Sequence, residues 1–296
     1  MINLKTKKIV VPYDFSKTAE NAVEHAAFVA AFTKGELYLV FVQKKNDILS
    51  MLLPSLSVKK PSTISDLLSE KLTAEAAKIS KKYGVKVTPI FSTGNITTEL
   101  INICEEIDAN LIVMGTQGGD SNNDLFMGSN TYRTLTKSEL PILTVRTAPS
   151  KKGFSNIVLP IDLSSHTRQK VNMAIQLAKL FTSHIYVIGL YNDDEKAEKF
   201  KLDVYLNQIE KECLKNKVSF TSFAAKTSNK VKRTLQFSKK VNADIIVSMT
   251  DQDTEFKSSI LSNYIHQLIN NSKTPILCIK PEISEMSAGG TAGIPF

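Results

Sequence analysis

Residues 9–16 read IVVPYDFS and residues 157–164 read IVLPIDLS, so one pattern occurs twice at a separation of 148 positions. Farther along, the run LIV at 111–113 recurs as IIV at 245–247, now 134 positions apart. Self-similarity of this kind indicates a repeated structural unit. We interpret the chain as a tandem duplication whose second copy is 14 residues shorter between these two matches, and we place the missing segment at 46–61.

Each copy alternates short β-branched runs with longer amphipathic segments, a pattern that predicts parallel β-sheets covered by helices on both faces. Residues 17–33 place alanine and valine on one helical stripe, and Ser16 is positioned to cap that helix, as Ser164 or Ser165 is in the second copy. In the first copy we expect strands at 8–13, 36–43, 85–91, 110–115 and 141–146, and helices at 17–33, 63–83, 96–108 and 129–138. In the second copy we expect strands at 156–161, 184–190, 217–224, 244–249 and 275–280.

The length of 296 residues suggests about two domains. We expect an N-terminal domain at 1–148 and a C-terminal domain at 153–281, each long enough to form its own core. The segment 282–296 is rich in Gly, Ser and Ala and is expected to be a flexible tail.

Composition and charge narrow the class of protein. The chain is 42% apolar and 22% charged, which is typical of globular proteins, and it has neither an apolar run long enough to span a membrane nor an apolar N-terminal signal segment. Cys104, Cys213 and Cys278 are odd in number and widely spaced, so we interpret them as reduced thiols of a cytoplasmic protein. The net charge of +8 is spread as lysine pairs without interleaved aromatic residues, which argues against a nucleic-acid partner.

The segment VMGTQGGDSNNDLFMGSN at 113–130 contains four of the 12 glycines of the chain, at positions 115, 118, 119 and 128. Open α/β sheets bind ligands beyond the carboxyl ends of their strands, and amides at a helix N-terminus favour phosphate. Glycine permits close backbone approach and positive φ. Residues 128–130 are therefore candidates to hold phosphate, and Asp14 is a candidate to bind a ribose or an adenine amino group. The alternatives are a structural glycine turn and, for Asp14, a turn or capping role.

At these residues the sequence resembles the universal stress protein family. The spacing Gly115-x2-Gly118-x9-Gly128-Ser129 matches the nucleotide-binding motif G-x2-G-x9-G-[S/T] of that family, and KKIVVPYDFS and LIVMGTQGG are similar to its first and fourth strands. The resemblance implies two doubly wound α/β domains of the adenine-nucleotide alpha-hydrolase type, each with five strands in the order 3-2-1-4-5.

The resemblance also implies a binding site for ATP or AMP. Pro12, Asp14 and Val42 would line the adenine, whereas Gly115, Gly118, Gly128, Ser129 and Asn130 would hold the ribose and phosphates; Met114 precedes the first glycine. Asp120 and Asp124 are candidates to reach an Mg²⁺ or Mn²⁺ ion on the phosphates, because hard cations favour carboxylate oxygens.

The second copy departs from the motif at all four of its fixed positions, which are occupied by Met249, Gln252, Ser262 and Asn263, although Asp162 matches Asp14. We therefore expect no nucleotide in that copy. Its expected role is that of a docking partner that covers a sheet edge and forms an internal pseudo-dimer, with a further homodimer left open.

Three functions stay open at this point. The first is a stress-response module that binds ATP or AMP in the N-terminal copy. The second is a protein-interaction module, with an unidentified protein partner, in which neither copy binds nucleotide. The third is a slow ATPase, for which the sequence offers no residue that we can assign as a general base and hence no catalytic residue.

Overall fold

A computed structural model describes residues 8–44, 61–116, 127–146, 153–163, 167–192, 196–250 and 263–281. The N-terminal copy contains β1 (Lys8–Pro12), α1 (Lys17–Thr33), β2 (Glu36–Gln43), α3 (Pro61–Tyr83), β3 (Lys86–Thr93), α4 (Ile96–Glu106), β4 (Leu111–Gly115), α5 (Ser129–Lys137) and β5 (Ile142–Val145). The C-terminal copy contains β6 (Asn156–Ile161), α6 (Thr167–Phe181), β7 (His184–Tyr191), α7 (Lys196–Lys215), β8 (Phe220–Lys226), α8 (Lys230–Lys240), β9 (Ile245–Met249), α9 (Asn263–Asn271) and β10 (Ile276–Ile279).

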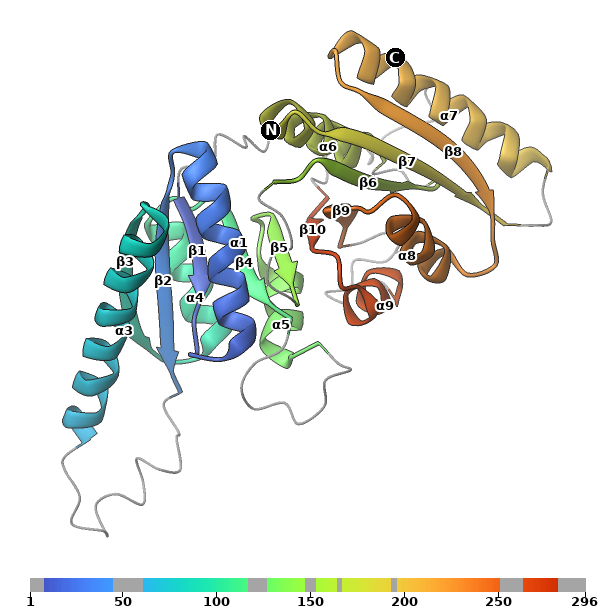
Figure 1. Ribbon diagram of the computed structural model, residues 1–296. Helices are drawn as coiled ribbons and strands as arrows, with labels where there is room; N and C mark the ends of the chain where they lie inside the picture. Colours follow the sequence, from blue (N-terminus) through green and yellow to red (C-terminus); the bar gives the residue numbers. More distant parts are fainter. Residues whose placement is uncertain are drawn as a thin grey trace, which may run out of the picture.

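The strands of both copies join in one ten-stranded sheet with the order β3-β2-β1-β4-β5-β10-β9-β6-β7-β8. Each half therefore has the predicted order 3-2-1-4-5, and Figure 1 shows the two halves meeting at β5 and β10. The predicted two-domain α/β fold is confirmed. The expected strand at 217–224 begins later, at Phe220, and the expected helix at 96–108 ends at Glu106.

The pairing of β5 with β10 is antiparallel, whereas neighbouring strands within each copy pair in parallel. Leu143 lies opposite Leu277 in this pairing, and these two residues are also equivalent in the repeat, 134 positions apart. A contact between equivalent residues indicates a pseudo-twofold axis at this pair, as in an isologous dimer. The C-terminal copy thus covers the β5 edge of the N-terminal copy, as the sequence predicted.

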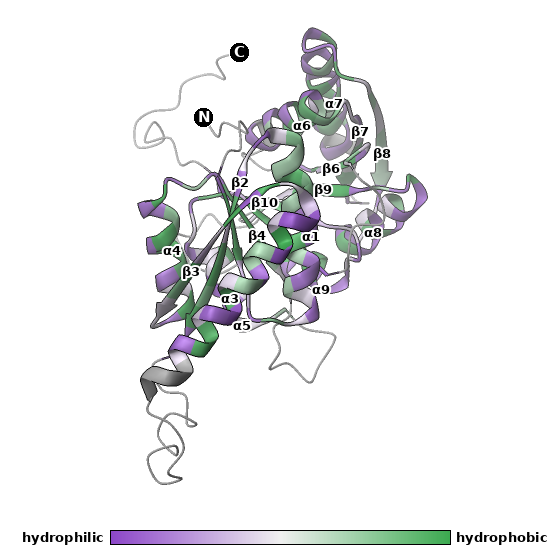
Figure 2. Cartoon of the chain, turned by 60° about the vertical axis from the view of Figure 1, so that its left-hand side comes forward, coloured by the Kyte–Doolittle hydropathy of each residue, from purple (hydrophilic) through white to green (hydrophobic). Residues whose placement is uncertain are grey.

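Successive side chains of a strand point to opposite faces of the sheet, so the buried residues form two clusters, one on each face. Ile9 and Val11 of β1 belong to one buried cluster, which is covered by α1, α3, α6 and α7. Val10 belongs to the other, which is covered by α4, α5, α8 and α9. The predicted stripe of α1 is buried against the first cluster, and the Ser16 hydroxyl caps α1 by accepting the Ala19 N–H. Figure 2 shows mostly hydrophobic strands between helices that carry their hydrophilic residues outward.

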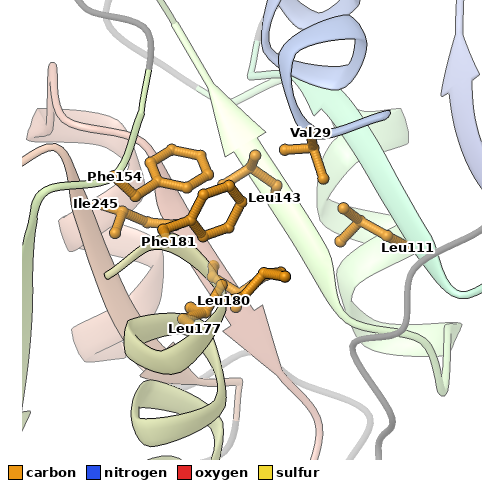
Figure 3. A pocket seen from close by; sticks show the side chains of 9 residues that line it. Val29, Leu111, Leu143, Phe154, Leu177, Leu180, Phe181 and Ile245 are labelled. Carbon is orange, nitrogen blue, oxygen red and sulfur yellow. The ribbon is translucent and has the colours of Figure 1, made fainter. Parts of the chain in front are cut away.

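The two copies also meet through an aromatic cluster over the β5–β10 pair. Phe28 and Phe32 of α1 contact Phe181 of α6, with ring centroids 5.8 and 4.7 Å apart, and Phe154 packs edge-on against Phe181 at 5.1 Å. A small apolar cavity of about 20 Å³ lies beside them, as Figure 3 shows. It is lined by Val29, Leu111, Leu143, Phe154, Leu177, Leu180, Phe181, Ile245 and Leu277. Such a volume has room for about one water, but its lining offers no polar partner to hold one.

Several expectations fall on residues that the structure does not describe. These are most of the 46–61 segment, most of the join between the copies, the proposed cap at Ser164 or Ser165, and the expected tail at 282–296. Among the residues that are described, no helix is long and apolar enough to cross a membrane.

Candidate functional site

The candidate site lies where β1 and β4 end next to each other. The two strands pair at Ile9 with Leu111 and at Val10 with Ile112, and β1 has β2 on its other side. The chain leaves β1 toward α1 on one face of the sheet and leaves β4 toward α5 on the other. Connections that diverge in this way form the ligand crevice of open α/β sheets.

Three predicted site residues lie on the same face of the sheet at its carboxyl edge. Met114 is buried, and the half-buried Val42 packs against the same core cluster, on the face covered by α4 and α5. Pro12 is two residues beyond Val10, which belongs to this cluster, so strand alternation places it on that face as well. The three residues therefore form an apolar strip at the ends of β2, β1 and β4. A strip of this kind suits a flat apolar ligand surface.

Asp14 forms the turn between β1 and α1. Its Oδ1 accepts the Ser16 N–H at 3.0 Å, and Phe15 between them has a positive φ of 62°. The Asp14 side chain thus has the turn role that was one of its two interpretations. Asp14 is also exposed, at the carboxyl end of β1.

The two described glycines of the motif serve different purposes. A Cβ added at Gly115 would lie 2.9 Å from the Cβ of Thr18 and 3.0 Å from its carbonyl group, so glycine lets the first turn of α1 pass close to the end of β4. Gly128 has φ −60° and ψ 146°, which other residues also adopt. The motif therefore does not depend on positive φ at Gly128. Glycine also places no side chain at the start of α5.

The start of α5 has the properties of an anion site. Gly128 is the N-cap and has no side chain to cap the helix, and the first turn contains no acidic residue. Ser129 is exposed and Asn130 is half-buried. The first N–H groups of a helix lack partners within the helix and carry partial positive charge, so they favour an anion.

The backbone at this helix start is anchored to the end of β4. The Gly128 N–H donates to the Thr116 carbonyl at 2.8 Å, and the Thr131 hydroxyl donates to the Gly115 carbonyl at 2.9 Å. These bonds bring Gly115, Gly128, Ser129 and Asn130 together next to the apolar strip. Gly118, Asp120 and Asp124 lie outside the described residues. Within the described ranges, no group of three or more His, Cys, Asp or Glu side chains is arranged to hold a metal ion.

The corresponding crevice of the C-terminal copy contains charged side chains. Asp162, the counterpart of Asp14, is buried and lies 3.5 Å from the ammonium of Lys230. Lys170, in the first turn of α6, is fully buried, and burial lowers its pKa to about 8 despite the nearby Asp162 carboxylate. Met249 stands where the first copy has Gly115 and is fully buried. This crevice is thus built differently from that of the N-terminal copy. Gln252 and Ser262 are not among the described residues.

Lys170, Lys230 and Asn270 of α9 were not among the residues predicted from the sequence. The repeat offers a signal for the lysines, because their counterparts in the first copy are the apolar Ala22 and Ile96. Lys170 gives the clearer signal, because it replaces the fully buried Ala22 of a helical stripe. Asn270 corresponds to Thr136 and gives no comparable signal, because its partner lies in the other copy.

Comparisons with known proteins give the same family for both copies. The sequence matches the universal stress protein family over residues 5–146 and 153–280. Universal stress protein MJ0577 of Methanocaldococcus jannaschii is 33% identical over 153 residues, covering 47% of this chain and 94% of that protein. Universal stress protein MJ0531 of the same organism is 29% identical over 143 residues, covering 47% of this chain and 82% of that protein.

Solved structures show the fold over both copies together. A universal stress protein from Archaeoglobus fulgidus aligns with a TM-score of 0.72 at 18% identity, covering 93% of this chain and 96% of that one. A putative universal stress protein from Pseudomonas aeruginosa aligns with a TM-score of 0.65 at 16% identity, covering 94% and 95%. With the family matched twice along the sequence and its strand order present in each half, the chain belongs to the universal stress protein family and carries two of its domains in tandem.

Proposed function

We propose that the N-terminal domain, residues 1–148, binds one adenine nucleotide, ATP or AMP, and that the protein acts in a stress response through conformation or a protein partner. The observation that carries this proposal is the juxtaposition at the ends of β1 and β4. An apolar strip of Pro12, Val42 and Met114 adjoins the uncapped start of α5. The strip suits an adenine, and the helix start suits phosphates.

The other candidate site residues would have the roles that the family resemblance implies. Asp14 would bind the adenine or ribose at the mouth of the crevice, and Gly115, Gly118, Gly128, Ser129 and Asn130 would hold the ribose and phosphates. An Mg²⁺ or Mn²⁺ ion would accompany the phosphates. We assign no catalytic residue and expect at most slow ATP hydrolysis.

The C-terminal domain, residues 153–281, would serve as an internal pseudo-dimer partner without a nucleotide of its own. Its crevice contains a buried lysine and the bulky Met249 in place of Ala22 and Gly115. We place the protein in the cytoplasm, because its three cysteines are free and buried, as expected in a reducing compartment.

A pure interaction module is the alternative function. Two candidate site residues favour it because they already have structural roles. Asp14 forms a turn, and Gly115 makes room for α1. In that case the motif would preserve the geometry of the loop without a ligand.

The two functions differ in the ultraviolet spectrum of the purified protein. The chain has no Trp and 8 Tyr, so bound adenine would dominate the absorbance at 260 nm. We expect protein purified without a nucleotide-removal step to show excess absorbance at 260 nm. This excess should disappear after unfolding and desalting, and the released compound should co-elute with ATP or AMP on ion-exchange chromatography. A spectrum of protein alone, before and after unfolding, would favour the interaction module.

A further inference from the structure

We propose that the C-terminal copy positions the phosphate-binding end of the N-terminal site through Asn270, near the end of α9. This inference rests on the proposed nucleotide site and extends it. It gives the copy without the glycine motif a specific part in the binding site of the other copy. Asn270 would be a positioning residue, because it touches the backbone that leads into the site.

The central contact joins the two copies directly. The Oδ1 atom of Asn270 accepts the Met127 N–H at 2.7 Å, and Met127 immediately precedes Gly128. The Met127 side chain is buried at 9% exposure in the core cluster that contains Met114. A partly buried N–H that loses its acceptor is left unsatisfied, which is costly. The bond therefore fixes where the chain enters α5.

Asn270 is itself held in place by the N-terminal copy. Its carbonyl accepts a hydrogen bond from Arg146 Nη1 at 2.9 Å, and the Arg146 carbonyl accepts one from Asn21 Nδ2 at 3.1 Å. Asn21 is a buried residue of α1, one turn after Thr18, which contacts Gly115. A path of contacts thus runs from Met127 through Asn270 and Arg146 to the helix that lies against the end of β4.

The residue types at this contact differ between the two copies. Tyr132 and His266 are equivalent in the repeat and face each other across the axis, with ring centroids 6.0 Å apart. The equivalent of Asn270 is Thr136, whose hydroxyl donates within its own helix to the Arg133 carbonyl at 2.9 Å. The Asn270 contact therefore runs from the copy that has lost the motif to the copy that retains it.

The first test is ATP binding to nucleotide-stripped, full-length protein by calorimetry. We expect Asn270→Ala to weaken ATP binding by roughly three- to tenfold, because the helix start loses one of its anchors. Asn271→Ala is the matched control. Asn271 is the next residue of α9, is exposed, and donates within its helix to the Gln267 carbonyl at 2.8 Å. Its substitution should leave the affinity unchanged, and equal affinity of Asn270→Ala and the wild type would overturn the proposal.

The second test follows the Met127 amide by hydrogen exchange in protein without nucleotide. Exchange should be faster in Asn270→Ala than in the wild type, and slow in Asn270→Asp, which retains a side-chain oxygen as acceptor. Equal exchange in the wild type and Asn270→Ala would overturn the Asn270 contact itself. Failure of the wild type to bind ATP would instead overturn the proposed function and the ligand part of this inference, so the two failures are distinguishable.

Discussion

Replacing Lys170 with methionine is expected to stabilise the folded protein at pH 7 by about 2–3 kcal/mol. Lys170 is fully buried, and its ammonium has no hydrogen-bond partner among the described residues. Burial lowers its pKa from 10.5 to about 8, with Asp162 acting against this shift and Lys230 adding to it. A charged lysine in the first turn of a helix also opposes the helix dipole. Methionine has a similar length without the charge.

The stability gained by the Lys170→Met substitution should decrease as the pH rises. The pKa of Lys170 is lower in the folded state, so the unfolded chain binds the proton more tightly. The cost of the buried charge is present in full below about pH 8 and fades between about pH 8 and the unfolded pKa of 10.5. A pKa shift of this size corresponds to about 3 kcal/mol of lost stability. The variant also removes the attraction between Lys170 and the Asp162 carboxylate, which reduces the expected gain.

Urea unfolding of the wild type and Lys170→Met at pH 7 and pH 10 measures this effect. The stability difference between the two proteins should be large at pH 7 and much smaller at pH 10. Lys179→Met, at an exposed position of the same helix, is the control and should change stability by less than about 0.5 kcal/mol. A less stable Lys170→Met at pH 7, or a difference that does not change with pH, would contradict this account.

Truncating Leu143 to alanine is expected to destabilise the protein by about 2–5 kcal/mol. Leu143 is buried at 2% exposure, lies opposite Leu277 on the pseudo-twofold axis and lines the apolar cavity. The substitution removes buried methyl groups and enlarges a cavity that already exists, so little relaxation can compensate. The substitution therefore weakens packing at the β5–β10 pair, which joins the two copies.

Because of the pseudo-symmetry, Leu277→Ala should have a similar cost, and the double variant should depart from the sum of the two by about 0.5 kcal/mol or more. Denaturant unfolding followed by circular dichroism measures all three. Leu67→Ala, at a position with 53% exposure in α3, is the matched control and should change stability by less than about 0.5 kcal/mol. A cost below 1 kcal/mol at Leu143 would show that β5 and β10 do not form a tightly packed joint.

Much of the fold was predictable because it depends on local patterns that occur twice. Three such patterns are the alanine stripe of α1, the Ser16 cap and the apolar runs of β1 and β4. Each depends on burial or capping within one copy. The strand order came from the family resemblance. The spacing of Gly115 and Gly128 predicted that both glycines lie near one strand end, and the structure brings both to the end of β4.

The parts that were not predicted depend on contacts between segments far apart in the sequence. The sequence predicted that the second copy covers an edge, but the antiparallel pairing of β10 with β5 is a tertiary contact without a local pattern. The bond from Asn270 to Met127 spans 143 positions and involves a backbone N–H, which has no residue signature. The reason for glycine at position 115 is also tertiary, since only the approach of Thr18 reveals it.

The central claim, one nucleotide site in the N-terminal copy, is tested most directly by calorimetry of ATP and AMP binding to nucleotide-stripped wild type and Gly128→Val. The backbone of Gly128 suits valine, so the variant should fold, while its side chain would block the open start of α5. Ser262→Val, at the corresponding position of the second copy, is the control. We predict binding at one site per chain in the micromolar range for the wild type and Ser262→Val, and its loss in Gly128→Val. Absence of binding to the wild type, or undiminished binding to Gly128→Val, would contradict the account.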